Sequence, residues 1–305
     1  MILCVCPNPS IDTYYWLNDL FPGTSNRVIK QNQYPGGKGV HVGFALNELG
    51  EQAGILGFWA GVNGTWIKEK CAEKKISCFG PDVIGASRKC ITLVTKQGDS
   101  DFNNTELLET GPSISKEDFD LFNIQFQKMV LQIDFLCLSG SWPIGAPQDA
   151  YRDLILQATK SDKKVILDAS GAQLENALKA KPFGLHLNLE EAKFLYQTDD
   201  CQSILQDLGE KVELVALTAG KKGLYLLYKG IFIQANVHIP KVISSVGSGD
   251  SLTAGIAYAL HQEMSPKDIA RWGVACGAAN CLREDLGMFY REDVFNLLKE
   301  VTIKN

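Results

Sequence analysis

The chain has 305 residues, a formal net charge of −5 at pH 7 and a hydrophobic share of 45%, which is ordinary for a globular protein with a large core. It carries no long basic run, so nucleic acid is not an expected partner. No apolar stretch approaches the ~20 residues that a membrane-spanning helix requires, and the first residues lack the basic flank of a signal peptide. The chain has nine cysteines, an odd number with irregular spacing, which is not typical of a disulfide framework. We therefore expect reduced thiols and a cytoplasmic protein.

The first third of the chain mixes strands and helices without a regular order. Helical spacing predicts helices at 40–49 and 65–75, and Ser115 followed by Asp118 predicts a further helix start. A turn signal at 96–99 predicts a hairpin. Short apolar runs rich in β-formers predict strands at 2–6, 13–20, 27–34, 53–58, 90–95 and 100–104.

From residue 135 onward, strands alternate with helices. Strands are expected at 135–138, 165–167, 185–187 and 214–218, with helices between them at 150–159, 173–178 and 190–196. This alternation implies right-handed crossovers and a mostly parallel sheet with helices on both faces. A hairpin then closes one edge and helices end the chain, at 224–228, 231–235, 251–261, 266–282 and 292–300. We expect one α/β domain over 1–305, with the early mixed strands as a small appended sheet.

Polar residues directly follow several of the predicted strands. In chain order they are Asp12, Ser139, Asp168, Asn188 and the segment 219–223. In open parallel sheets, ligands bind outside the carboxyl ends of the strands. The sequence therefore predicts a ligand site at this edge of the sheet.

The strongest single motif lies at 246–255. Gly247, Ser248 and Gly249 are followed by Asp250 and then by an apolar run with helical spacing. Glycine permits backbone conformations closed to other residues, and the free N–H groups of a helix start attract anions. An acid beside a bound phosphate suggests a base that takes a proton from an attacking hydroxyl. A helix start with an acidic first turn explains the same spacing equally well.

Other polar residues also allow two interpretations. Lys38, in a glycine-rich turn at 36–39, and Arg88 could hold a phosphate, or both could be solvated. Asp12 could accept hydrogen bonds from sugar hydroxyls or form an Asx-turn. Asn188 and Glu191 could share the water shell of Mg²⁺ or form an N-cap with an acid at N3.

Taken in order, these motifs resemble the PfkB branch of the ribokinase-like sugar kinases, and most closely its phosphosugar group, with 1-phosphofructokinase and tagatose-6-phosphate kinase. The resemblance runs nearly the full length of the chain. It implies a ribokinase-like three-layer α/β/α fold with a mostly parallel central sheet and a small β-sheet lid from about 12–34 and 88–105. The matching segments are 8–12 (NPSID), 36–39 (GGKG), 139–143 (SGSWP), 167–171 (LDASG), Asn188 with Glu191, and 246–255 (VGSGDSLTAG).

The resemblance also implies roles. Asp250 would be the general base, and the N–H groups of Gly247, Ser248 and Gly249 would stabilise the transferring phosphoryl group. The substrate, a phosphorylated ketohexose such as fructose 1-phosphate or tagatose 6-phosphate, would be held by Asp12, Gly37, Lys38, Arg88 and Ser139. ATP would be bound by Asn188, Thr218, Gly220, Gly223 and Asn280, and Mg²⁺, through water, by Asn188 and Glu191. Lids in this family can pair, which implies a homodimer as a candidate assembly.

Several positions depart from the family pattern. His41 and Gly43 replace Asn and Ala, Trp142 replaces Leu, His186 replaces Lys, and the serines at 244–245 replace Asp-Thr. We expect these changes to affect nucleotide and metal affinity more than the chemistry, because the residues of the 247–250 motif remain.

The sequence supports ATP-dependent phosphoryl transfer to a hydroxyl of the phosphorylated ketohexose. One alternative is a kinase of an unphosphorylated sugar or nucleoside, which Lys38 and Arg88 disfavour because a neutral substrate needs no such cations. A second is a sugar-phosphate sensor that has lost most catalysis, which Asp250 disfavours.

Overall fold

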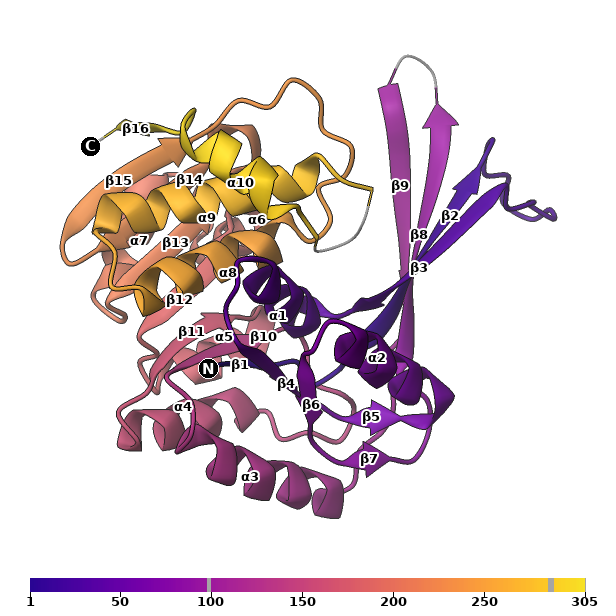
Figure 1. Cartoon of the computed structure of the whole chain (residues 1–305), viewed down its shortest axis with the longest axis horizontal. Helices are drawn as coiled ribbons and strands as arrows, with labels where there is room; N and C mark the ends of the chain where they lie inside the picture. Colours follow the sequence, from indigo (N-terminus) through magenta and orange to yellow (C-terminus); the bar gives the residue numbers. More distant parts are fainter. Residues whose placement is uncertain (98–99, 285–287, 305) are drawn as a thin grey trace.

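The computed structural model describes residues 1–97, 100–284 and 288–304, and a ten-stranded sheet forms its middle layer (Figure 1). The strand order is β16-β15-β14-β13-β12-β11-β10-β1-β4-β6. Neighbours from β6 to β13 pair in parallel and the remaining pairs are antiparallel, which confirms the mostly parallel sheet. In chain order, its strands are β1 (Ile2–Val5), β4 (Ala53–Leu56), β6 (Ser77–Phe79), β10 (Phe135–Ser139), β11 (Lys164–Asp168), β12 (Gly184–Asn188), β13 (Leu214–Thr218), β14 (Leu224–Tyr228), β15 (Ile231–Asn236) and β16 (Thr302–Lys304).

Helices cover both faces of this sheet, so the three-layer architecture is confirmed. Successive strand residues point to opposite faces. Ile2 and Cys4 of β1 therefore pack in one core, while Leu3 and Val5 pack in the other. The first core is closed by α1 (Lys38–Glu48), α2 (Gly61–Glu73), α8 (Ser248–His261), α9 (Pro266–Cys281) and α10 (Arg291–Leu298). The second is closed by α3 (Lys116–Val130), α4 (Ala150–Lys160), α5 (Gly171–Leu178), α6 (Leu189–Tyr196) and α7 (Cys201–Gly209).

A four-stranded sheet projects from this body (Figure 1), and we call it the small sheet. Its strands are β2 (Ser10–Leu17), β3 (Lys30–Gly36), β8 (Arg88–Gln97) and β9 (Ser100–Leu108), in the order β3-β2-β8-β9. It covers most of the range expected for the lid, and its motion as a lid stays a prediction. The centre of the predicted hairpin turn, 98–99, lies outside the described residues. A separate pair is formed by β5 (Trp59–Ala60) and β7 (Asp82–Val83).

The predicted elements differ from the observed ones in two informative ways. Helix α8 begins at Ser248 rather than 251, so Asp250 belongs to its first turn. Helix α7 was missed because it buries only Ile204, Leu205 and Leu208, too few positions for a long periodic pattern.

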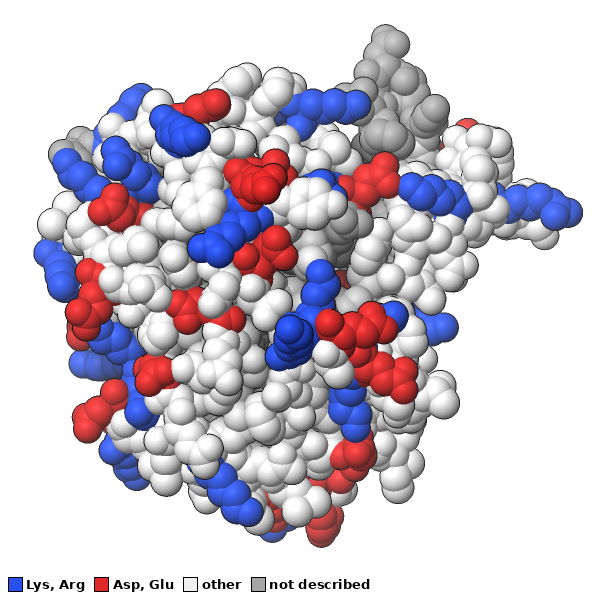
Figure 2. All heavy atoms as spheres, viewed as in Figure 1, with Lys and Arg blue, Asp and Glu red and all other residues white. Residues whose placement is uncertain are grey.

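Basic and acidic side chains are interspersed on the face seen in Figure 2. This face therefore has no large area of one charge sign. Within the described ranges, no helix has the length and apolar character needed to cross a membrane.

Candidate active site

A cavity of about 400 Å³ lies where the carboxyl ends of the parallel strands meet the small sheet and the starts of α1 and α8. It therefore lies at the edge of the sheet where the sequence predicted a ligand site. The structure brings together most of the predicted site residues in its lining: Asp12, Gly37, Lys38, Arg88, Asn188, Glu191, Thr218, Gly247, Ser248, Gly249 and Asp250.

Two helices begin at this cavity, and the N-cap residue of each is a glycine with a positive φ. The N-cap of α1 is Gly37, with φ 95°, and the N-cap of α8 is Gly247, with φ 81°. Neither helix start is capped by a side chain. Ser248 N–H donates to the Ser245 carbonyl at 3.2 Å, whereas those of Gly249 and Asp250 have no acceptor among the described residues. Unpaired N–H groups at the positive end of a helix dipole can bind an anion.

Asp250 is paired with a histidine rather than left free. His41 Nδ1 lies 2.8 Å from Asp250 Oδ2, and His41 Nε2 lies 3.2 Å from Asp12 Oδ2. Burial alone would lower the pKa of His41, but the two carboxylates outweigh it and raise the pKa to about 10. His41 is therefore charged at neutral pH and lies between the predicted base and the predicted sugar-binding acid.

Asp12 is held in place by Ser10 and Gly36 as well as by His41. Ser10 Oγ donates to Asp12 Oδ1 at 2.6 Å. The carboxylate packs directly on Gly36, where an added Cβ would lie 2.1 Å from Asp12 Cγ and 2.3 Å from each oxygen. A side chain at position 36 therefore cannot coexist with Asp12 in its present position.

The Gly36→Ala variant should lower kcat/KM for the sugar substrate on the order of 10- to 100-fold, the scale of a 1 Å misplacement of an active-site group. The new methyl displaces Asp12 and separates it from His41. Steady-state kinetics alongside a melting curve would check this. A folded variant with unchanged kcat/KM would contradict the assigned position of Asp12.

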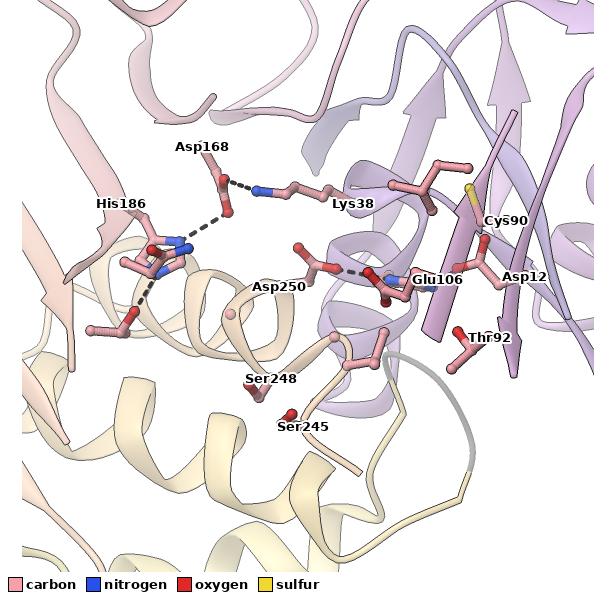
Figure 3. Close-up of a pocket in the computed structure, with 18 of the residues that line it drawn as sticks. Asp12, Lys38, Cys90, Thr92, Glu106, Asp168, His186, Ser245, Ser248 and Asp250 are labelled. Carbon is pink, nitrogen blue, oxygen red and sulfur yellow. Dashed lines mark hydrogen bonds and ion pairs between the residues drawn. The ribbon is translucent and has the colours of Figure 1, made fainter. Parts of the chain in front are cut away.

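Lys38 is committed to an acid across the cavity. Its Nζ lies 2.6 Å from Asp168 Oδ1 and 3.9 Å from Glu191 Oε1. In Figure 3, Lys38 extends toward Asp168, and Asp12 lies on the other side of the view. The carboxylate of Asp168 raises the pKa of Lys38 above its ordinary value. Burial would raise the pKa of Asp168, but Lys38 and then His186 outweigh it and hold that pKa well below its usual range.

His186 completes this buried network. Its Nδ1 lies 2.9 Å from Asp168 Oδ2 and 3.1 Å from Thr253 Oγ1, and its Nε2 lies 3.4 Å from Thr218 Oγ1. A Cβ added at Gly249 would lie 3.1 Å from His186 Cε1. The histidine that departs from the family pattern thus supports the start of α8 from inside the protein.

Arg88 is the cation that remains available. Its Nε donates to the Asn8 carbonyl at 3.1 Å, which orients the guanidinium group. Among the described residues, no carboxylate pairs with it. Arg88, Cys90 and Thr92 alternate along β8 and all line the cavity, so this strand turns one face toward it.

Asn188 and Glu191 form the capping box that was one of their two interpretations. Asn188 Oδ1 accepts from the Glu191 N–H at 2.9 Å, and Glu191 Oε2 accepts from the Asn188 N–H at 2.9 Å. The Asn188 amide NH₂ remains for other contacts, and Glu191 Oε1 faces Lys38 Nζ at 3.9 Å. No cluster of three or more metal-ligating side chains occurs in the parts of the chain that the structure describes. The amide of Asn188 and the carboxylate of Glu191 are oxygen and nitrogen groups of the kind that can contact the waters of a hydrated Mg²⁺ ion.

Four predicted site residues do not line the cavity in the described chain. Ser139 is fully buried at the end of β10. Gly220 opens the short turn helix η1 (Gly220–Lys222), and Gly223 ends it, where a Cβ would lie 2.3 Å from the Ala235 carbonyl oxygen. Asn280 is also fully buried. An experiment can distinguish a structural role for this residue from a direct contact with the ligand.

Replacing Asn280 by alanine should destabilise the fold by roughly 1–3 kcal/mol, because it leaves buried polar groups without partners. Asn280 Nδ2 donates to the Val246 carbonyl at 2.9 Å, and Ser251 Oγ donates to Asn280 Oδ1 at 3.2 Å. Chemical denaturation would measure the loss. Unchanged stability together with a higher KM for ATP would favour a direct nucleotide contact instead.

Sequence reasoning left three residues of the site without a role. His41 and His186 were noted only as departures, and Asp168 only as a polar residue after a strand and as part of a matching segment. Asp168 directly follows a predicted strand and His41 lies just after a glycine turn, whereas His186 is a titratable residue inside the strand β12. Ser244, another departure, is buried and bonded to Tyr14 of the small sheet, with 3.0 Å between the two hydroxyl oxygens.

The fold matches several solved structures. A proposed phosphofructokinase from Staphylococcus aureus is 28% identical, with a TM-score of 0.83 over 100% of this chain and 98% of that one. A proposed 1-phosphofructokinase from Thermotoga maritima is 21% identical, with a TM-score of 0.88 over 99% of this chain and 98% of that one. Ribokinase from the same organism is 21% identical, with a TM-score of 0.80 over 98% of this chain and 99% of that one. The chain thus has the fold of the ribokinase-like kinases.

The family model for pfkB family carbohydrate kinases matches residues 6–289. The chain belongs to this family. It is accordingly an ATP-dependent sugar kinase, and the cavity contains the groups from which its active site can be built.

Proposed function

We propose that the protein transfers the γ-phosphoryl group of ATP to a hydroxyl of a phosphorylated ketohexose, fructose 1-phosphate or tagatose 6-phosphate. One observation carries the proposal. The cavity holds Asp250 and the unpaired N–H groups of the α8 start together with Arg88, a cation that no described carboxylate neutralises. The N–H groups and Arg88 can each bind an anion, and Asp250 can accept the proton of an acceptor hydroxyl.

In the proposed reaction, Asp250 accepts the proton of the acceptor hydroxyl on Oδ1, since His41 occupies Oδ2. The hydroxyl oxygen forms a bond to the γ-phosphorus while the bond to the bridging oxygen breaks, and ADP leaves with that oxygen. The N–H groups of Gly249 and Asp250 stabilise the charge on the transferring group. Gly247 and Ser248 shape the turn that presents these N–H groups, as their positions at the N-terminus of α8 allow.

The substrate phosphate is assigned to Arg88, with Lys38 as a second contact. Arg88 needs no change of partner to bind a phosphate, whereas Lys38 must leave or share Asp168 at 2.6 Å. Asp12 orients the sugar ring through lone pairs that His41 and Ser10 leave free. Ser139 is fully buried at the end of β10, and its hydroxyl has no hydrogen-bond partner among the described residues.

The nucleotide is assigned to the opposite side of the cavity, near Asn188, Glu191 and Thr218, with Gly220, Gly223 and Asn280 shaping its surroundings. When bound, Mg²⁺ neutralises charge on the phosphate oxygens. Glu191 Oε1 and the Asn188 amide are the side-chain groups that could contact its waters.

The direct test is product identification. Purified protein should convert at least one of the three phosphosugars fructose 1-phosphate, fructose 6-phosphate and tagatose 6-phosphate to a bisphosphate with ATP and Mg²⁺, seen by mass spectrometry and by ADP release. Turnover of only unphosphorylated sugars or nucleosides would favour the alternative kinase, which the pairing of Lys38 with Asp168 supports. Calorimetric binding of a phosphosugar without turnover would favour a sensor.

The remaining expectations stay predictions. Association of two chains through the small sheet can be tested by analytical ultracentrifugation. A dimer that persists when this sheet's exposed residues, such as Leu107 and Leu108, are replaced by glutamate would contradict it.

A further inference from the structure

We propose that His41 is a positioning residue of the phosphoryl transfer, whose positively charged ring joins Asp250 and Asp12 into one unit and fixes which oxygen of Asp250 faces the acceptor hydroxyl. This inference rests on the proposed function, because it takes Asp250 as the base. It assigns to this chain's own histidine a role that the family's usual asparagine, with its single amide, cannot fill in the same way.

The two carboxylates beside the ring favour its charged form. His41 Nδ1 lies 2.8 Å from Asp250 Oδ2 and Nε2 lies 3.2 Å from Asp12 Oδ2, and both partners are carboxylates. A neutral imidazole has one donor and one acceptor nitrogen, so it can satisfy only one of them. The imidazolium carries its charge to both: Nδ1 is hydrogen-bonded to Asp250, and Nε2 forms an ion pair with Asp12 at 3.2 Å without hydrogen-bond geometry. His41 is 4% exposed, so water does not substitute for either carboxylate.

His41 is the cation in direct contact with these two acids. Lys38, one turn earlier on α1, is 2.6 Å from Asp168. Asp250 and Asp12 make no other ion pair with a described residue. The other titratable groups around the ring line the same cavity or lie beneath the glycine turn: Arg88 and Cys90 on β8, Glu106 on β9, Asp168 on β11, His186 on β12, Glu191 on α6 and Cys6 after β1.

The bridge connects three parts of the fold. Asp12 belongs to β2 of the small sheet, His41 to α1 and Asp250 to α8. In Figure 3, Asp12 and Asp250 approach the same region from opposite sides, with a dashed contact at Asp250. Both oxygens of Asp12 are in contact, Oδ1 with Ser10 and Oδ2 with His41, whereas Asp250 has only Oδ2 in contact with His41 and keeps Oδ1 for the incoming hydroxyl. The substrate-orienting acid and the base are thereby kept in register.

The experiment compares His41→Asn and His41→Gln with the wild type, using the best phosphosugar and ATP. A matched control is His261→Asn, because His261 also lies between two carboxylates, 3.3 Å from Glu51 and 3.6 Å from Asp134, outside the cavity. We expect His41→Asn to lower kcat by about 10- to 100-fold, the scale of misorienting a catalytic group. Removing this positive charge should also change the pH dependence of kcat, because Asp250 loses the charged neighbour that its Oδ2 contacts. The control should change neither.

A second measurement does not depend on turnover. The raised pKa of His41, about 10, predicts that its ring is doubly protonated at pH 8.5 in the free protein. Nitrogen-15 NMR of histidine-labelled protein, with the His41 signals identified by their loss in His41→Gln, reads this state directly. A neutral ring at pH 8.5, or a folded His41→Asn with the wild-type kcat and pH dependence, would overturn the inference.

The outcomes separate this inference from the proposed function. If Asp250→Asn loses activity while His41→Asn keeps the wild-type profile, His41 has no positioning role and the base assignment stands. If Asp250→Asn keeps near-normal turnover, the base assignment itself fails, and the inference fails with it, whatever the NMR spectrum shows.

Discussion

Asp250→Asn should lower kcat by about 10²- to 10⁴-fold while leaving the fold intact, because positioned general bases contribute acceleration of that order. The change is nearly isosteric and removes only the ability to take a proton. In the wild type, the Asp250 carboxylate contacts His41 Nδ1. The amide of the variant preserves this contact when its oxygen turns toward Nδ1. The KM for each substrate should change far less than kcat.

Stopped-time assays at several pH values, with product confirmed by mass spectrometry, would measure the loss. The matched control is Asp168→Asn, which removes a buried acid of the same cavity that is bonded to Lys38 and His186 instead. Its main effect should be on stability, because it removes the buried carboxylate that Lys38 and His186 contact. Near-normal turnover of Asp250→Asn would contradict its assignment as the base.

Arg88→Ala should lower kcat/KM for the phosphosugar by about 10²- to 10⁴-fold. Two charge-assisted hydrogen bonds, at roughly 1.5–3 kcal/mol each, set this scale. The loss should appear mainly in KM for the phosphosugar, with KM for ATP nearly unchanged, because Arg88 lies on the small-sheet side of the cavity. Arg88→Lys should recover only part of it, since a point charge cannot replace a fork.

Lys89→Ala is the control for charge. It is the next residue on β8 and does not line the cavity. Its removal should leave kcat/KM close to the wild-type value. Equal losses for Arg88→Ala and Lys89→Ala, or equal effects of Arg88→Ala on both substrates, would show that Arg88 does not hold the substrate phosphate.

The sequence predicted the fold well where a local rule decides the structure. Short apolar runs, alternating with helical patterns, predicted the parallel strands. The glycine turns at 36–39 and 246–249 indicated that α1 and α8 begin near the site. The capping boxes at Ser115 and Asn188 follow from spacing alone. These features depend on residues only a few positions apart, which is why a single sequence can reveal them.

Features that depend on distant pairing were not predictable in the same way. Lys38 finds Asp168 130 positions away, and His41 finds Asp250 209 positions away. No local pattern says which acid a cation will meet, because that depends on how strands and helices pack. For the same reason Asn280, expected beside the nucleotide, turned out to hold the Val246 carbonyl.

The departures from the family pattern illustrate the same limit. Ser244 was expected to weaken the site by omitting an acid, yet its hydroxyl is bonded to Tyr14 and accepts from the Val246 N–H at 3.3 Å. It therefore links the small sheet to the turn before α8. A sequence comparison could identify the missing carboxylate but not the contact that replaced it.

The most direct test of the account is the ratio of kcat/KM for the best phosphosugar to that for its unphosphorylated parent sugar, measured on the wild-type protein with ATP and Mg²⁺. Because Arg88 is available for a phosphate that the parent sugar lacks, the account predicts a ratio of at least about 10². A ratio near one, or a preference for the unphosphorylated sugar, would contradict a phosphorylated ketohexose as the substrate.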